Sequence, residues 1–237
     1  MKNLAPLALI PFALAAHAAG TCQATSPAVP PTVVELYTSE GCSSCPPADR
    51  WLSTLKGRSD VLALAFHVTY WDRLGWPDRF ASAEGTKRQQ EWAQRSGSGQ
   101  VYTPQVLVNG RDWRIWPQLP AGTSTAPAAP KVTLQRDGET VTAQVAAGAS
   151  GARYGGYWAV LEDGHQSGVK AGENAGETLR HDHVVRLYQP VPAWAATADT
   201  RWPLTVSRGN AAFPRRVVFV VTDAATARPL QAVTLAC

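Results

Sequence analysis

Short apolar runs alternate with helical patterns in the first half of the chain. Three β-prone runs, residues 32–37, 61–68 and 105–108, are separated by two stretches of helical character, 48–55 and 83–95. Strands that alternate with helices predict βαβ units and a largely parallel start to a sheet. We therefore expect an α/β N-terminal domain.

The second half of the chain has a different pattern, in which short strand-like runs are separated by Gly, Asp, Asn and Pro. These runs are 132–134, 140–145, 157–161, 179–188, 204–206, 217–222 and 232–235. Regularly spaced short strands are typical of an antiparallel sandwich. The sequence therefore predicts an all-β, immunoglobulin-like sandwich as the C-terminal domain.

Two proline-rich breaks separate these patterns. Residues 20–31 are small and polar and predict an unstructured lead-in, and residues 117–130 have the composition of an interdomain linker. The expected organisation is an N-terminal domain over 31–118, a linker over 119–130 and a C-terminal domain over 131–237.

The first eighteen residues have the pattern of a secretory signal peptide. Lys2 gives a positive start, residues 4–16 form an apolar core, and Ala16-His17-Ala18 matches an A-x-A cleavage site. We therefore expect cleavage near Ala18 and a periplasmic or secreted protein. No other apolar run in the sequence is long enough to span a bilayer, so no membrane span is expected.

Composition and charge narrow the function classes. The 237 residues are 45% hydrophobic and 17% charged, which indicates a folded chain, and the net charge of +4 is spread along the sequence. Without a dense Lys/Arg cluster there is no case for a nucleic-acid partner. The motifs of serine hydrolases, phosphate-binding loops and zinc proteases are absent, and no cofactor is expected.

Four cysteines allow three pairings, and export makes disulfides stable. Cys22 and Cys237 lie at the two ends of the mature chain, where a disulfide would fix the lead-in to the last strand. Cys42 and Cys45 are three residues apart. We favour the pairing Cys22–Cys237 with Cys42–Cys45 over the crossed alternatives.

Cys42 and Cys45 follow a strand and precede a helical pattern. At a helix N-terminus, free N–H groups and the helix dipole stabilise a thiolate, which is the form that attacks disulfides. Cys42 is then the expected solvent-exposed nucleophile and Cys45 the resolving thiol. Because a residue before proline avoids the α region, the regular helix is expected to begin at Pro46, with both cysteines in its entry turn.

Thr103-Pro104 directly precedes the third strand, which ends at an Asn-Gly turn. With the C-x-x-C segment, this arrangement resembles the thioredoxin superfamily. The resemblance implies a thioredoxin-like fold for residues 31–118 and a cis proline beside the cysteines. It also implies that Thr103 and Pro104 bind substrate.

Four segments together resemble a narrower family of secreted bacterial proteins that is catalogued only as a domain of unknown function. They are ELYTSEGCSSCPPAD (35–49), FHVTYWDRLGWPD (66–78), VYTPQVLVNG (101–110) and AGENAGETLRHDHVVR (171–186). This resemblance spans both predicted domains. It implies a thioredoxin-like fold and no assigned reaction.

Glu35 lies inside the first strand, where a carboxylate is costly unless it has a partner or a role. Enzymes of the thioredoxin superfamily often keep a buried acid there that relays a proton to the resolving cysteine. By that resemblance Glu35 is a candidate catalytic residue, although it lies seven positions before Cys42 and the usual distance is six. The alternative is a strand residue with one solvated face.

Several aromatic and polar residues follow the second strand, at the sheet edge where ligands gather in open α/β folds. Trp71 and Trp76 are candidate substrate-binding residues, and His67, Tyr70 and Asp72 are possible walls of the site. The alternative is a tryptophan-rich packing loop with His67 as a core histidine.

Metal binding is a further alternative. Cys42, Cys45 and His67 would suit copper or zinc, but a second C-x-x-C is absent, and His181 and His183 are expected to lie side by side on one strand face. We therefore assign no metal site from the sequence.

The hypothesis from sequence is an exported thiol-disulfide oxidoreductase-like protein whose partners are protein or small-molecule thiols and disulfides, or a redox partner protein. Whether the chain is an enzyme stays open. The alternatives are a non-catalytic binding protein with a static disulfide and a periplasmic copper- or zinc-handling protein that uses the same thiols.

Overall fold

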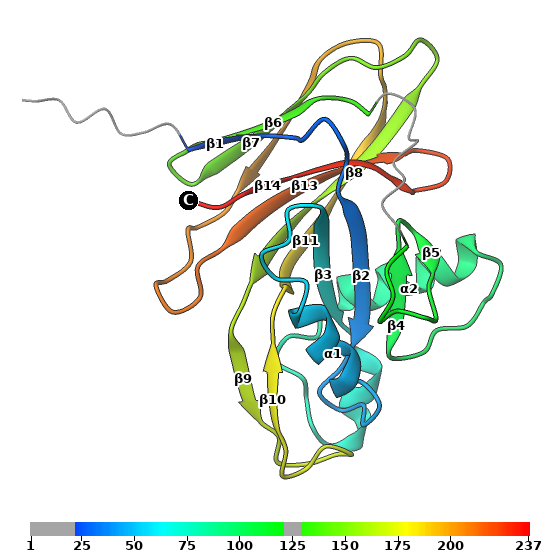
Figure 1. Cartoon of the computed structure of the whole chain (residues 1–237), viewed down its shortest axis with the longest axis vertical. Coiled ribbons are helices and arrows are strands. Elements are labelled where there is room, and N and C mark those ends of the chain that lie inside the picture. Colours follow the sequence, from blue (N-terminus) through cyan, green and yellow to red (C-terminus); the bar gives the residue numbers. More distant parts are fainter. Residues whose placement is uncertain (1–21, 121–128) are drawn as a thin grey trace, which may run out of the picture.

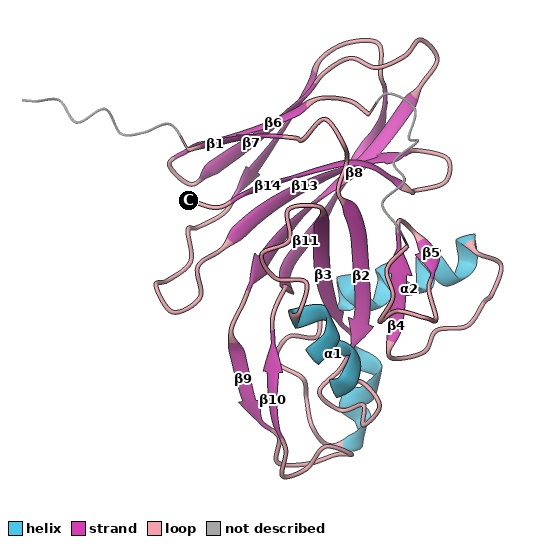
Figure 2. Cartoon of the chain, viewed as in Figure 1, coloured by secondary structure: helices cyan, strands magenta, loops and turns pink. Residues whose placement is uncertain are grey.

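The computed structural model describes residues 22–120 and 129–237. The expected signal peptide, residues 1–18, lies outside the described residues, as does most of the expected linker. Strands make up 42% of the structure and helices 13%, and Figure 2 shows the few helices gathered around one end of a large sheet. The fold is therefore mostly β.

One sheet of eight strands organises the molecule (Figure 1). Its order is β14-β13-β8-β11-β3-β2-β4-β5. The bounds are β2 Thr32–Thr38, β3 Val61–His67, β4 Gln105–Val108, β5 Arg111–Asp112, β8 Arg153–Glu162, β11 Val184–Ala195, β13 Arg216–Asp223 and β14 Pro229–Leu235. Within it β2 and β3 are parallel, β4 is antiparallel to β2, and β11 joins β3 in parallel where Val184 pairs with Ala65.

The predicted fold class, an α/β thioredoxin-like domain followed by an all-β immunoglobulin-like sandwich, is wrong. The strands β2, β3 and β4 form part of a mostly β structure and share their sheet with β8, β11, β13 and β14. The physical reason for the shared sheet is that the second half of the chain pairs with the edge of β3. The Ala65 N–H of β3 donates to the carbonyl of His183 at 2.8 Å. A free strand edge is a template for pairing, and here the second half of the chain occupies it.

A second sheet of four strands has the order β1-β6-β7-β12. The bounds are β1 Gln23–Thr25, β6 Val132–Asp137, β7 Thr140–Val145 and β12 Thr200–Thr205. Because β1 pairs with β6, the prediction of an unstructured lead-in is wrong for residues 23–25. The Cys22–Cys237 disulfide adds a covalent link between the start of β1 and the chain just beyond β14.

Side-chain alternation divides the core between the two faces of the large sheet. Along β8, Trp158 and Val160 face the four-stranded sheet, whereas Tyr157 and Leu161 face the opposite side. Both faces are covered at β2, β3 and β13, so these strands are buried almost throughout. Each fully buried Leu or Val side chain contributes about 1.5–3 kcal/mol, which makes these cores the main source of stability.

Two helices cover the part of the large sheet formed by β2, β3 and β4. Helix α1, Pro46–Ser53, packs Leu52 against Val34 and Leu36, and α2, Ala83–Arg95, places Trp92 in the core on the opposite face. The α2 N-cap is Ser82, whose hydroxyl accepts from the Gly85 N–H at 2.9 Å. The two helices therefore lie on opposite faces, as Figure 1 shows.

A two-stranded hairpin extends from the sheet alongside α1 (Figure 1). It consists of β9, His165–Gly168, and β10, Thr178–His181. The connecting segment 169–177 reaches the loop that contains the two central cysteines. On the side of β3, a short 3-10 helix, η1, Thr69–Leu74, leads into the segment before α2. These elements surround the candidate site.

None of the helices within residues 22–120 and 129–237 has the length and apolar character that crossing a membrane requires.

Candidate functional site

Cys42 and Cys45 form a disulfide in the turn between β2 and α1. The Cys45 N–H donates to the carbonyl of Cys42 at 3.2 Å, and Cys45 is the N-cap residue of α1. The helix begins at Pro46, as the sequence predicts, because proline lacks an N–H and tolerates the first helical position. Both cysteines therefore lie in the entry turn of the helix.

The expectation that Cys42 is open to solvent is wrong. Cys42 and Cys45 are both 0% exposed. The two residues between them, Ser43 and Ser44, are exposed, so the disulfide lies directly beneath the surface and not deep in the core. Access to sulfur is therefore limited by what covers this turn.

The segment 169–177 forms a cover over the cysteine turn. The Asn174 side-chain amide donates to the carbonyls of Glu40 and Cys42, at 2.8 and 3.0 Å. The neighbouring Glu173 accepts from the Ser43 N–H at 2.9 Å, and this exposed contact lowers the pKa of Glu173. Asn174 is buried and Glu173 is exposed. Asn174 therefore holds the cover from the inside, and Glu173 holds it at the protein surface.

The Thr103–Pro104 peptide is cis, and it lies beside the cysteine turn. The Ser44 hydroxyl lies 3.4 Å from Cys42 Sγ and donates to the Thr103 carbonyl at 3.5 Å. The Trp71 indole N–H donates to the Thr103 hydroxyl at 2.7 Å. Candidate residues from three separate segments thus meet at one place on the surface.

The substrate-binding candidate Trp76 and the expected wall residues Tyr70 and Asp72 have structural partners. The Trp76 indole N–H donates to Glu40 at 2.7 Å, and the Tyr70 hydroxyl donates to Gln89 at 3.2 Å. Asp72 accepts from the Asp78 N–H at 3.1 Å. All three are partly buried, so this loop is both a packing element and one side of the site.

Glu35 points to the face of the sheet that is opposite to α1. Arg88 of α2 binds both of its carboxylate oxygens, at 2.7 and 2.9 Å, and Tyr37 and Tyr157 donate to them at 2.9 and 3.4 Å. Along β2, Glu35 shares its face with Tyr37, whereas Val34 and Leu36 face α1. Glu35 is thus placed in a buried ion pair, away from the cysteines.

His67, at the end of β3, lies in the interior and forms an ion pair with Asp78 at 2.6 Å through Nδ1. Burial alone would lower the pKa of His67, but the nearby Asp78 carboxylate raises it above its usual value. Burial opposes the charge of Asp78 as well, yet His67 lowers the pKa of Asp78 to about 2. His67 therefore belongs to a buried polar cluster and not to the solvent-facing wall.

Four residues that the sequence analysis did not select as site residues complete this polar cluster, which we define as Glu40, Asp49, His67, Asp78 and His181. Asp49, one turn after Cys45, accepts from the Thr38 hydroxyl at 2.9 Å, and burial raises its pKa. Glu40 precedes Cys42 by two residues, and His181 ends β10. All five are buried, at 1–8% exposure.

His181 and His183 do not share a strand face. His183 has a positive φ of 58°, which ends the strand alternation between β10 and β11. Its Nδ1 lies 3.2 Å from Arg216, whereas the His181 ring lies 5.0 Å from the His67 ring. The backbone turn thus sends one histidine into the polar cluster and the other away from it.

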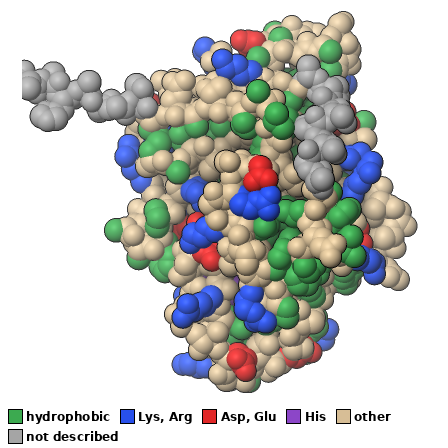
Figure 3. Space-filling view, viewed as in Figure 1, with side chains coloured by type: hydrophobic (Ala, Val, Ile, Leu, Met, Phe, Trp, Pro, Cys, Tyr) green, Lys and Arg blue, Asp and Glu red, His purple; other side chains and the backbone are tan. Residues whose placement is uncertain are grey.

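The surface around these elements carries no concentrated charge on the face seen in Figure 3, where Lys and Arg side chains of the described residues are spread singly. Charged side chains are instead concentrated in the polar cluster, which is buried inside the protein.

The chain belongs to the family DUF1223, described as proteins of unknown function. The family model matches residues 33–222 and so covers the cysteine turn, the polar cluster and most of the large sheet. The search of curated proteins found no match.

Two solved structures are similar to this chain. The crystal structure of protein AGR_C_4864 from Agrobacterium tumefaciens is 27% identical with a TM-score of 0.64, covering 86% of this chain and 93% of that one. HBP35 of Porphyromonas gingivalis is 15% identical with a TM-score of 0.60, covering 89% of this chain and 76% of that one, and supports the fold alone.

Proposed function

We propose that Cys42 and Cys45 exchange electrons with thiols and disulfides of other exported proteins or of small molecules. The observation that carries this proposal is the meeting of the Cys42–Cys45 disulfide with the cis Thr103–Pro104 bend through Ser44. The local arrangement resembles the redox sites of the thioredoxin superfamily, and this support concerns the site and not the fold class. Two disulfides are compatible with an extracellular location, and export through residues 1–18 is part of the proposal.

The proposed reaction is a two-electron exchange. A partner thiolate attacks Cys42 Sγ, the Cys42–Cys45 bond breaks, and Cys45 leaves as a thiolate at the start of α1. A second partner thiolate then attacks the partner sulfur of the mixed disulfide, and Cys42 leaves as a thiolate. The partner is oxidised to a disulfide and the cysteine pair is reduced, and the same steps run in reverse when the reduced pair meets a disulfide.

In this proposal the cover must withdraw before the first attack, because both sulfurs are buried. Glu173 is exposed and holds the cover in place by accepting from the Ser43 N–H. Glu177 lies in the same segment and is also exposed. Glu173→Ala should therefore accelerate reduction of Cys42–Cys45 by dithiothreitol several-fold, whereas the matched control Glu177→Ala should leave the rate unchanged. Quenching with an alkylating reagent and peptide mass spectrometry measure the rate for each disulfide separately.

The decisive test equilibrates the native protein with mixtures of reduced and oxidised glutathione. We expect the Cys42–Cys45 pair to titrate with a potential between about −270 and −120 mV while Cys22–Cys237 stays oxidised. A Cys45→Ala variant, which leaves Cys42 without its resolving partner, should accumulate mixed disulfides when it is expressed with its export signal.

The complete burial of both sulfurs favours a second candidate, a binding protein with a static disulfide. If Cys42–Cys45 stays oxidised in native protein at millimolar dithiothreitol and Cys45→Ala captures no partner, the exchange proposal is wrong. The static disulfide is then the better account of the site.

A further inference from the structure

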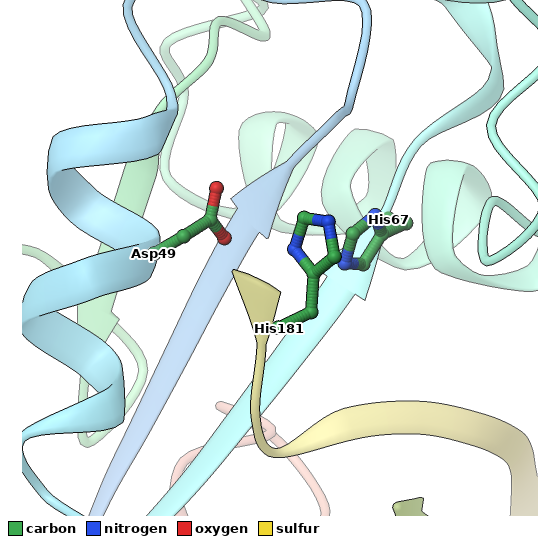
Figure 4. Close-up of side chains that lie close together, drawn as sticks. All are labelled: Asp49, His67 and His181. Carbon is green, nitrogen blue, oxygen red and sulfur yellow. The ribbon is translucent and has the colours of Figure 1, made fainter. Parts of the chain in front are cut away.

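Three donor side chains converge beside the cysteine turn. Asp49 of α1, His67 of β3 and His181 of β10 each offer one donor atom, and these atoms all lie within 4.8 Å of one another. Figure 4 shows the three side chains pointing toward a common volume from three different elements. Two imidazole nitrogens and a carboxylate oxygen are a donor set that binds zinc and related divalent transition metals.

Several donor atoms of the polar cluster lack hydrogen-bond partners. Within the described residues, His67 Nε2, both ring nitrogens of His181 and Glu40 Oε1 are buried without one. Glu40 Oε1 and His181 Nε2 are 3.2 Å apart, which is close enough for an ion pair, but the angles do not make a hydrogen bond. Since buried polar atoms are nearly always paired, a group of orphaned donors around one volume requires an explanation.

Asp78 holds His67 in the orientation that a metal ligand needs. The Asp78 carboxylate can only accept, so the proton of the 2.6 Å contact is on His67 Nδ1. The Nε2 atom, which has no hydrogen-bond partner within the described residues, can then present a lone pair. A carboxylate behind a histidine is the usual support of a metal-bound imidazole, because it fixes the tautomer and the ring direction.

The charge of the polar cluster is also unbalanced. Glu40, Asp49 and Asp78 are three carboxylates, and their hydrogen-bonding partners among the described residues include no Lys or Arg side chain. Two imidazolium groups can offset at most two of these three carboxylates. A divalent cation between Asp49 and His181 would supply the missing positive charge where burial makes it most valuable.

A cavity borders two of the proposed ligands. A cavity of about 130 Å³ opens between α1 and β10 and is lined by Pro46, Asp49, Arg50 and the β10 residues up to His181. Two of the proposed ligands, Asp49 and His181, therefore line a space that small ions can reach. This cavity lies on the α1 side of the cysteine turn and does not require the cover to open.

We propose that Asp49, His67 and His181 bind one divalent transition-metal ion of the zinc class, with Glu40 as the fourth ligand and Asp78 as the support of His67. The site uses no sulfur, since Cys42 and Cys45 are joined in a disulfide. At ligand distances of about 2.0–2.1 Å, donor atoms around a tetrahedral ion lie about 3.4 Å apart, so the side chains must move inward when the ion binds. Within the described residues no hydrogen bond holds the His181 ring, and its Nε2 already lies 3.2 Å from Glu40, the proposed fourth ligand.

The test uses the full mature protein with both disulfides intact, stripped with a chelator and then exposed to Zn(II). We expect one zinc per chain by elemental analysis after desalting. X-ray absorption at the zinc edge should give nitrogen and oxygen ligands at about 2.0–2.1 Å and no sulfur at about 2.3 Å. Absence of zinc uptake, or a shell that contains sulfur, would overturn the proposal without any variant.

Variants then assign the ligands. His181→Asn and Asp49→Asn should weaken zinc binding by at least about 100-fold, and Asp78→Asn, which acts through His67, by about 10–100-fold. The matched control is His183→Asn, which removes a buried histidine two residues from His181 and should leave affinity unchanged. Unaltered binding in both His181→Asn and Asp49→Asn, with folding verified by circular dichroism, would refute the assignment.

This site is independent of the proposed thiol exchange, and one variant separates the two. A protein carrying both Cys42→Ser and Cys45→Ser should retain stoichiometric zinc although it cannot exchange disulfides. Loss of zinc binding in this variant while it stays folded would mean that the ligands are the thiols, and the assignment to Asp49, His67 and His181 would be wrong.

Discussion

Two clusters of buried charge lie on opposite faces of the same strands and differ in how completely they are paired. On the α2 face, Arg88 meets both oxygens of Glu35, and Tyr37 and Tyr157 donate to the same carboxylate. On the α1 face, both ring nitrogens of the buried His181 lack a hydrogen-bond partner within the described residues, although Nε2 lies 3.2 Å from Glu40. We call the cluster around Glu35 the closed cluster, because its charged groups are paired. We call the polar cluster the open cluster, because several of its donor atoms lack hydrogen-bond partners within the described residues.

The comparison teaches that burial and charge alone do not identify a functional site. Glu35 is as deeply buried as Glu40, at 1% exposure each. The Glu35 carboxylate raises the pKa of Arg88 despite burial, and burial with Glu35 raises the pKa of Tyr37, so each group keeps its ordinary protonation state. What distinguishes the α1 face is unused hydrogen-bonding capacity, which a protein interior seldom leaves without a purpose.

The largest effect is expected from breaking the closed cluster. Arg88→Met leaves the Glu35 carboxylate buried without its cation, and removal of one partner of such a pair costs about 3–5 kcal/mol. Urea denaturation followed by tryptophan fluorescence measures the loss. The double variant Glu35→Leu with Arg88→Met should recover most of it, because no unpaired charge remains. A loss below about 1 kcal/mol for Arg88→Met would show that the ion pair is not what stabilises this face.

A second effect concerns His183, the buried histidine outside both clusters. Burial and then the neighbouring Arg216 lower the pKa of His183 to about 4, while Asp163 and Asp182 act in the opposite direction. In the unfolded chain this pKa is about 6.5, so the unfolded state binds the proton first as pH falls. The stability is complete above about pH 6.5, and up to about 3 kcal/mol is lost on acidification toward pH 4.

Denaturation curves recorded between pH 7 and pH 4 measure this loss. His183→Asn keeps a residue that tolerates positive φ and removes the titration, so its pH dependence should be flatter than that of the unaltered protein. Identical slopes for the two proteins would assign the acid sensitivity to other groups.

The smallest effect is expected at the open cluster in metal-free protein. Asp49→Asn removes a charge that burial disfavours, as the raised pKa of Asp49 indicates, and retains an acceptor for Thr38. The free energy of unfolding should change by less than about 1 kcal/mol, far less than for Arg88→Met. Matched denaturation curves in the presence of chelator test this, and a loss of several kcal/mol would mean that the open cluster is structural after all.

Local structure was largely predictable from the sequence. The runs 32–37, 61–68 and 105–108 correspond to β2, β3 and β4, and the polar stretch 83–95 is helix α2. Short-range patterns report local structure well because apolar periodicity and proline act over a few residues. The start of α1 at Pro46 follows from the same kind of rule.

Long-range pairing was not predictable, and it caused the error in fold class. Nothing in either strand indicates that Val184 will pair with Ala65, because β3 and β11 are both apolar and carry no register signal for each other. The proline-rich break at 117–130 favoured two independent domains, but composition does not reveal whether the flanking segments share a sheet.

The candidate site was predictable only in part. The cysteine turn and Thr103-Pro104 carry recognisable motifs, whereas Asp49 and His181 come from distant segments that meet through the β9–β10 hairpin. The position of Glu35 was not predictable because both faces of β2 are buried, so alternation could not tell which face its carboxylate joins. The cover was missed since loop contacts such as Asn174 with Cys42 leave no periodic signal.

The Cys22–Cys237 disulfide closes nearly the whole described chain into a covalent ring, because the two cysteines have a sequence separation of 215. A protease that cuts once within this ring, for instance in the exposed turn near Glu177, opens the circle but releases no fragment. The two pieces stay joined until a reductant separates them, so a single cut need not mean loss of any part.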